Sequence, residues 1–94
     1  MFTIKWEGDA VVILDQRRLP VREAYSTYRH YSGVVNSIKD MEIRGAPAIG
    51  VAAAMGIALA SLNFDDAKPE KFRERMNDAI GLFAAARPTA VNLF

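Results

Sequence analysis

The feature that most constrains the fold is an uncharged run of sixteen residues, 47–62, rich in alanine and glycine. It opens with a proline, which is favoured in the first turn of a helix because its missing N–H has no helical partner there. The run is shorter than the roughly 20 apolar residues of a membrane span, so no membrane partner is expected. It predicts a helix buried on all sides, in which Gly50, Ala54 and Gly56 let neighbouring elements approach closely.

The residues before this run have the pattern of a small antiparallel sheet. Apolar and polar residues alternate over 2–7, which is typical of a half-buried strand, and a tight-turn pair at 8–9 leads into the β-branched run 11–14. A third strand is expected around residues 22–29, where the alternation is weaker. Trp6 is expected to lie in the core between the sheet and the helices.

The period changes to helical from Ser32, a good N-cap residue, onward. Four apolar residues share one face of this first helix: Val34, Val35, Ile38 and Met41. A polar loop at 63–68 precedes a third helix that begins at Pro69 and ends before Arg87. The sequence therefore predicts one α+β domain over residues 1–94, with the antiparallel sheet in 1–31 and a helical bundle in 32–94.

Composition excludes several kinds of function. The 94 residues contain no cysteine and a single histidine, so a disulfide scaffold, a thiol nucleophile and a histidine-based metal centre are not expected. The net charge of +1 argues against a nucleic-acid partner. His30 is expected to be a loop residue, and the pair at 65–66 a capping feature of the third helix rather than a metal site. The first residues have no signal-peptide pattern, which predicts a cytoplasmic protein.

One arrangement favours anion binding. Arg44 and Gly45 stand directly before the N-terminus of the uncharged helix, whose first turn offers unpaired N–H groups and the positive end of the helix dipole. Glycine lets an anion approach the backbone, and arginine can hold a phosphate with two parallel hydrogen bonds. Arg87 stands before Pro88 in the same way, so the two arginines could converge on one phosphate. A turn glycine beside a surface arginine is the simpler interpretation of the same residues.

Long stretches of the chain resemble one enzyme family. The stretch Met-Glu-Ile-Arg-Gly-Ala-Pro-Ala-Ile-Gly at residues 41–50 and the stretch Ala-Arg-Pro-Thr-Ala-Val-Asn-Leu-Phe at 86–94 resemble two signatures of the methylthioribose-1-phosphate isomerases. The opening, with Ile-Lys-Trp-Glu-Gly-Asp at 4–9, is similar as well. The family shares a superfamily with the regulatory subunits of initiation factor 2B and with ribose-1,5-bisphosphate isomerase.

This resemblance implies an aldose–ketose isomerase that converts 5-methylthioribose 1-phosphate to 5-methylthioribulose 1-phosphate in methionine salvage, without metal or organic cofactor. It implies a homodimer whose subunits have a small N-terminal domain and a larger Rossmann-like domain, the latter absent from this chain. Substrate-phosphate binding is carried over to Arg44, Gly45, Ala46 and Arg87. The catalytic cysteine and aspartate of the family lie in the second domain, so no catalytic residue is expected here, and the 94 residues alone are expected to be inactive.

Two alternatives remain open from the sequence. The chain could belong to a non-catalytic regulatory subunit of the initiation-factor 2B kind, which would lack the cysteine and aspartate of the second domain. It could also be a short interaction module whose apolar end at Leu93 and Phe94 is covered by a partner. Several matching stretches in the right order favour a truncated isomerase domain, and the stretch Arg-Pro-Thr-Ala-Val-Asn-Leu at 87–93 separates this family from its relatives best.

Overall fold

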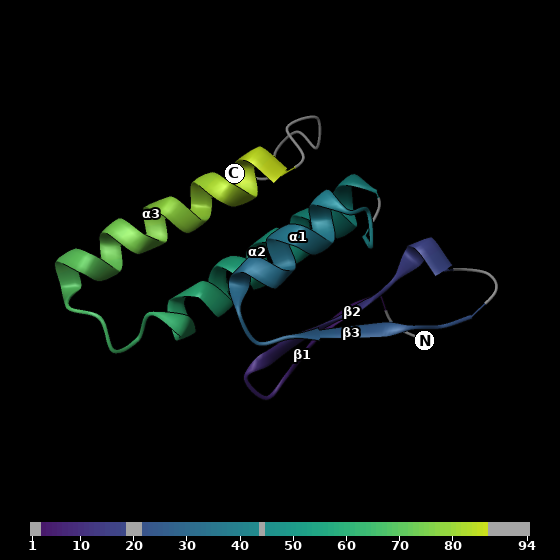
Figure 1. The fold of residues 1–94 in the computed structure, drawn as a ribbon, viewed down its shortest axis with the longest axis horizontal. Coiled ribbons are helices and arrows are strands. Elements are labelled where there is room, and N and C mark those ends of the chain that lie inside the picture. The colour runs from purple at the N-terminus through teal and green to yellow at the C-terminus, as the bar shows by residue number, and fades with distance from the viewer. Residues whose placement is uncertain (1–2, 19–21, 44, 87–94) are drawn as a thin grey trace.

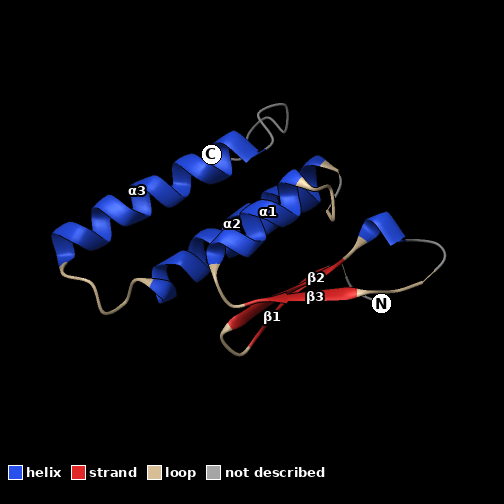
Figure 2. Cartoon of the chain, in the orientation of Figure 1, coloured by secondary structure: helices blue, strands red, loops and turns tan. Residues whose placement is uncertain are grey.

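A computed structural model describes residues 3–18, 22–43 and 45–86 as a three-stranded sheet followed by three long helices (Figures 1 and 2). The elements are β1 (Ile4–Glu7), β2 (Ala10–Leu14), the short 3-10 helix η1 (Gln16–Arg18), β3 (Tyr25–Tyr28), α1 (Tyr31–Lys39), α2 (Ala46–Asn63) and α3 (Pro69–Ala86). This order confirms the predicted α+β class, the three strands and the three helices.

The sheet is antiparallel with the order β1-β2-β3. The hairpin turns at Gly8, whose φ of 62° is a left-handed conformation that glycine adopts without steric cost. Trp6 and Tyr28 flank Val11 across the two ladders, and this register places Val11 and Ile13 on the face that meets the helices. The register therefore decides which residues of the central strand enter the main core.

Trp6 does not lie in the core, which corrects the prediction. By register it points to the same face as Val11, yet 37% of its surface remains exposed. The physical reason is its position: β1 is an edge strand, and Trp6 stands next to the hairpin turn, where neighbours approach from one side only. The central strand β2 is buried along its whole length instead.

Helix α1 begins and ends differently from the prediction. His30 is its N-cap, and the Nδ1 atom of this exposed side chain accepts a hydrogen bond of 3.2 Å from the Ser32 backbone N–H, so Ser32 is not the cap. Met41, expected on the apolar face, lies two residues beyond the helix and is 44% exposed. Its φ of 64° turns the chain out of the helical path, which carries its side chain into solvent.

Helix α2 is buried on one face only, although it is apolar on every face. Ile49, Ala52, Ala53, Gly56, Leu59 and Ala60 form the buried face. Val51, Ala54, Ala58 and Leu62 form the opposite, exposed face. The prediction of burial on all sides is therefore wrong. The packing role given to Gly50 and Ala54 is wrong too, because Ala54 is exposed and a Cβ at Gly50 would meet no atom of the described residues within 4 Å.

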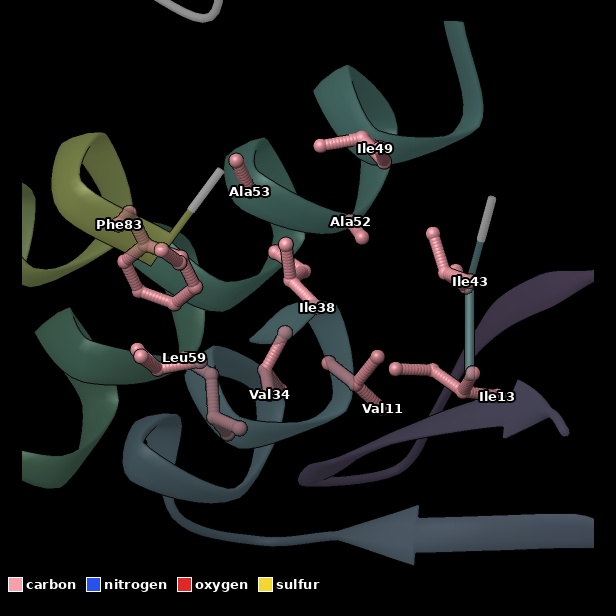
Figure 3. Packing of buried hydrophobic residues seen from close by; sticks show 12 residues of the cluster. Val11, Ile13, Val34, Ile38, Ile43, Ile49, Ala52, Ala53, Leu59 and Phe83 are labelled. Carbon is pink, nitrogen blue, oxygen red and sulfur yellow. The ribbon is translucent and has the colours of Figure 1, made fainter. Parts of the chain in front are cut away.

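Gly56 has the predicted packing role. A Cβ at this position would overlap the ring of Phe83 and lie 3.0 Å from Val34 Cγ1. The missing side chain thus lets α1, α2 and α3 meet at one point, and the fully buried Phe83 fills the space. Figure 3 shows Phe83 facing Leu59 and Ala53, with Val34 and Ile38 between α2 and the sheet.

The layers follow from these contacts. Helices α1 and α2 pack on the sheet, and α3 packs on α1 and α2 on the side away from the strands (Figure 1). The side chain of Asn63 links the end of α2 to the start of α1, since it accepts from Tyr31 N–H at 2.9 Å and donates to Arg29 C=O at 2.9 Å. Among the described residues, no helix has the length and apolarity that crossing a membrane requires.

We predict that Gly56→Ala destabilises the fold. The added methyl group has no room between Phe83 and Val34, and overpacking of this kind costs about 1–3 kcal/mol. The free energy of unfolding from urea denaturation should fall by up to about 2 kcal/mol after the gain in helix propensity, about 1 kcal/mol, is counted.

Gly50→Ala is the matched control, because it makes the same substitution in the same helix where a Cβ meets open space. It should raise the free energy of unfolding by about 0.5–1 kcal/mol. Equal effects of the two substitutions would contradict the packing role of Gly56.

Candidate functional site

The N-terminus of α2 has the form that anion binding requires. Gly45 is the residue before the helix, with φ 91° and no side-chain hydrogen bond capping the first turn. Its carbonyl accepts the first helical bond from Ile49 N–H at 2.9 Å, while Pro47 occupies the first turn. Among the described residues, no atom lies within 4 Å of where a Cβ at Gly45 would stand, so the space beside its Cα is free.

Of the four predicted binding residues, the structure describes Gly45 and the backbone of Ala46. Arg44, Arg87 and the side chain of Ala46 lie outside the described residues. The predicted convergence of the two arginines on one phosphate therefore stays a prediction. Gly45, exposed at the start of α2, is the part of the candidate site whose geometry is known.

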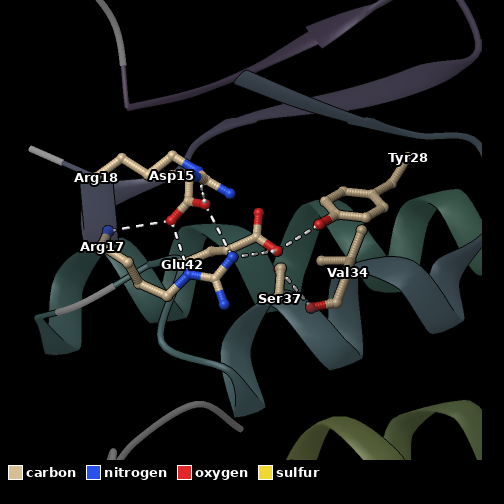
Figure 4. Close-up of polar contacts among 7 residues, drawn as sticks. All are labelled: Asp15, Arg17, Arg18, Tyr28, Val34, Ser37 and Glu42. Carbon is tan, nitrogen blue, oxygen red and sulfur yellow. Dashed lines mark hydrogen bonds and ion pairs between the residues drawn. The ribbon is translucent and has the colours of Figure 1, made fainter. Parts of the chain in front are cut away.

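A buried polar cluster, which the sequence did not predict, lies between the sheet and the loop that leads to Gly45 (Figure 4). Asp15 directly follows β2 and is only 4% exposed. Its two oxygens accept hydrogen bonds from Arg17 Nε at 2.9 Å and Arg17 Nη2 at 2.8 Å, and Arg18 Nε lies 3.3 Å away. A buried carboxylate needs such pairing, and the two-pronged arginine contact supplies it.

Glu42 is the second carboxylate of the cluster and is 6% exposed. Its Oε2 accepts a hydrogen bond of 2.6 Å from the Tyr28 hydroxyl and lies 4.0 Å from Arg17 Nη2. Burial, and then the hydrogen bond to Glu42, raise the pKa of Tyr28 to about 12, so the phenol keeps its proton and donates at neutral pH. Arginine, tyrosine and two carboxylates thus form one connected network.

A sequence signal exists for half of this cluster. An acidic residue directly after a buried strand and two residues before an arginine, as at Asp15 and Arg17, is the spacing of a local ion pair. Glu42 and Tyr28 are fourteen positions apart, and their contact depends on how α1 packs on the sheet. No local pattern predicts such a pair.

The described residues include no group of three or more metal-ligating side chains. A surface hollow lined by Lys68, Pro69, Glu70 and Lys71 lies at the start of α3, near the opposite end of α2 from Gly45. Its lining is the exposed first turn of a helix, so it adds nothing to the candidate site.

Comparison with protein families gives one match, to the Initiation factor 2 subunit family over residues 42–94. This covers more than half of the chain and begins at Glu42, three residues before Gly45. The chain belongs to the initiation factor 2 subunit family. Its buried Glu42, the turn at Gly45 and helices α2 and α3 all lie in the matched region.

Individual members of the family are similar over almost the whole chain. The methylthioribose-1-phosphate isomerase of Syntrophus aciditrophicus is 51% identical over 92 residues, which are 98% of this chain and 25% of that protein. The crystal structure of 5-methylthioribose 1-phosphate isomerase from Pyrococcus horikoshii matches with a TM-score of 0.91 and 36% identity over 98% of this chain. Subunit delta of translation initiation factor eIF-2B from A. fulgidus matches with a TM-score of 0.88 and 37% identity over the same share. The chain spans about a quarter of the length of these relatives.

The ion pair between the buried carboxylate of Asp15 and the half-exposed Arg17 predicts a specific acid dependence of stability. The hydrogen bonds from Arg17 lower the pKa of Asp15 from 3.8 to about 2 in the folded state. Because folding lowers this pKa, the stabilisation is complete above the unfolded value of 3.8 and is lost as the pH falls through about 2. Asp15→Asn should remove this part of the pH dependence and lower the free energy of unfolding at pH 7 by about 2–4 kcal/mol.

The measurement is the free energy of unfolding of the wild type and of Asp15→Asn, from urea denaturation between pH 2 and 7. Asp9→Asn is the control, since Asp9 forms a 3.6 Å ion pair with Arg29 in which both side chains are mostly exposed. It should change the free energy of unfolding by less than about 1 kcal/mol. A pH profile for Asp15→Asn that parallels the wild type would contradict the role assigned to Asp15.

Proposed function

We propose that this chain is the substrate-phosphate-binding, N-terminal part of an aldose–ketose isomerase that converts 5-methylthioribose 1-phosphate to 5-methylthioribulose 1-phosphate. The observation that carries the proposal is the identity of about half, over 98% of this chain, to proteins named as this isomerase. Methionine salvage as the pathway, a cytoplasmic location and a homodimeric parent protein are parts of the same proposal. Residues 1–94 form its first domain, with the sheet in 1–31 and the helices in 32–94.

The chemistry explains what this part contributes. Phosphate on the anomeric carbon keeps the sugar ring closed, so the enzyme must open the ring and move a hydrogen between C1 and C2. That step needs a positioned acid and base in a pocket that excludes water. In this proposal Arg44, Gly45, Ala46 and Arg87 hold the phosphate, and the proton-transfer groups come from residues beyond this chain. The first turn of α2, which no side-chain hydrogen bond caps at Gly45, supports the phosphate role.

A regulatory subunit of initiation factor 2B is the second candidate. The similarity of the A. fulgidus eIF-2B subunit delta, with a TM-score of 0.88 against 0.91 for the isomerase, supports the fold of both candidates almost equally. Formation of 5-methylthioribulose 1-phosphate by the complete gene product, followed by phosphorus NMR, separates the two. An isomerase turns the substrate over, and a regulatory subunit leaves it unchanged.

We expect the isolated 94-residue chain to show no isomerase activity. Binding the phosphate orients the sugar, but orientation without an acid and a base gives little rate. The same assay applied to residues 1–94 and to the complete gene product tests this expectation. Turnover by the isolated chain above the uncatalysed rate would show that it carries its own proton-transfer groups.

Arg44→Ala in the complete gene product should raise KM for the sugar phosphate about 10–100-fold, because a charge-assisted phosphate contact is lost. Arg29→Ala is the matched control, since the Arg29 side chain is 70% exposed and pairs only with Asp9 among the contacts described. It should leave KM unchanged. An unaltered KM in Arg44→Ala would exclude Arg44 from phosphate binding.

A further inference from the structure

The loop between α1 and α2 is held at one residue, Glu42, by contacts from three other elements. Its backbone N–H donates to Ser37 C=O of α1 at 2.9 Å, and its C=O accepts from Gln16 N–H of η1 at 2.8 Å. Its carboxylate accepts from the Tyr28 hydroxyl of β3 at 2.6 Å. The residue is therefore fixed through its backbone on both sides and through its side chain.

The described residues next to this anchor have distinctive backbone and packing features. Met41 on one side has a left-handed φ of 64°, which is uncommon for a residue with a side chain, and Ile43 on the other side is completely buried. Gly45 follows two residues later with φ 91°. Glu42 is thus an anchored residue three positions before Gly45, the N-cap of α2, and a residue with left-handed φ lies on either side of it.

Stability alone does not explain a carboxylate at Glu42, because burying a charged group costs free energy. Its side chain is 8% exposed, its Oε1 has no hydrogen-bond partner among the described residues, and its ion pair to Arg17 is long at 4.0 Å. Buried charges paired in this way contribute little net stability compared with apolar side chains of similar size. The contacts of the carboxylate with Tyr28 and Arg17 instead fix the orientation of the Glu42 side chain (Figure 4).

We infer that Glu42, held by Tyr28, is a positioning residue that sets the backbone of Gly45 for binding a phosphate group. The inference rests on the proposed function, because it assumes that the anion binds at the start of α2. It assigns Glu42 no contact with the substrate. Its effect passes through the two intervening residues to the N–H groups of the first helical turn.

Inorganic phosphate is the probe, titrated into the complete gene product labelled with 15N-glycine. The backbone amide resonance of Gly45, assigned by its loss in Gly45→Ala, reports the Kd of folded molecules only, so reduced stability does not alter it. Glu42→Ala should raise this Kd about tenfold, and Tyr28→Phe about three- to fivefold. Glu42→Gln keeps an acceptor for the Tyr28 hydroxyl and should restore most of the affinity.

Tyr25→Phe is the matched control. Tyr25 lies on the same strand, and its hydroxyl donates to Glu23 at 2.8 Å on the exposed side, so the substitution removes a phenol–carboxylate bond that does not reach the loop. The Kd of Tyr25→Phe for inorganic phosphate should equal that of the wild type. Tyr28→Phe keeps the ring that packs against Gly33 and retains the fold.

The outcomes distinguish failure of the positioning role of Glu42 from failure of the phosphate site itself. If phosphate shifts the Gly45 resonance in the wild type but all variants bind equally well, Glu42 has no positioning role and the proposed site stands. If the wild type shows no shift at Gly45, the phosphate site itself is wrong, and the positioning role falls with it. A Tyr28→Phe protein that does not fold would also overturn the inference, because a purely structural role would then be sufficient.

Discussion

Burial of one face of α2 is the interaction on which the rest of the structure depends. The sheet, α1 and α3 each pack against this helix. The contact works because the buried face is made of small residues interrupted by Ile49 and Leu59, and because Gly56 leaves room for Phe83. A side chain of ordinary size at that point would separate α3 from the other two helices. The orientation of α2, including its N-terminus at Gly45, follows from this packing.

Much of the fold could be predicted from the sequence, because its elements carry strong local patterns. The strand alternation, the turn at Gly8 and the prolines at the starts of α2 and α3 each have a local physical cause, and the elements formed where these causes place them. Apart from the N-cap of α1, which is His30 and not Ser32, the errors concern exposure. Trp6 and the outer face of α2 are apolar in composition, and composition does not reveal whether a neighbouring element arrives to cover a surface. Edge position and packing order decide that, and both are properties of the whole fold.

The candidate site likewise has one part that local sequence predicts and one part that it does not. The place of Gly45 at a helix N-terminus could be predicted, since the glycine stands between an arginine and a helix-starting proline. In the structure Gly45 is the N-cap residue of α2 and has a left-handed φ. The carboxylate that anchors the loop could not be predicted. Glu42 meets Tyr28 only after β3 and α1 are packed together, so their hydrogen bond has no trace in local sequence. Arg44 and Arg87 lie outside the described residues, and their roles stay predictions.

The outer face of α2 has a practical consequence for handling the protein. Val51, Ala54, Ala58 and Leu62 expose a stripe without any ionisable group over about three helical turns. Such a stripe attracts other apolar surfaces. Self-association of the chain should therefore increase with its concentration more strongly than its balanced charge suggests. The two sides of this helix also differ in what they tolerate. Glutamate or lysine at Val51 or Ala58 would point into water and reduce self-adhesion, whereas one extra methyl group at Gly56, on the opposite side, disturbs three helices at once.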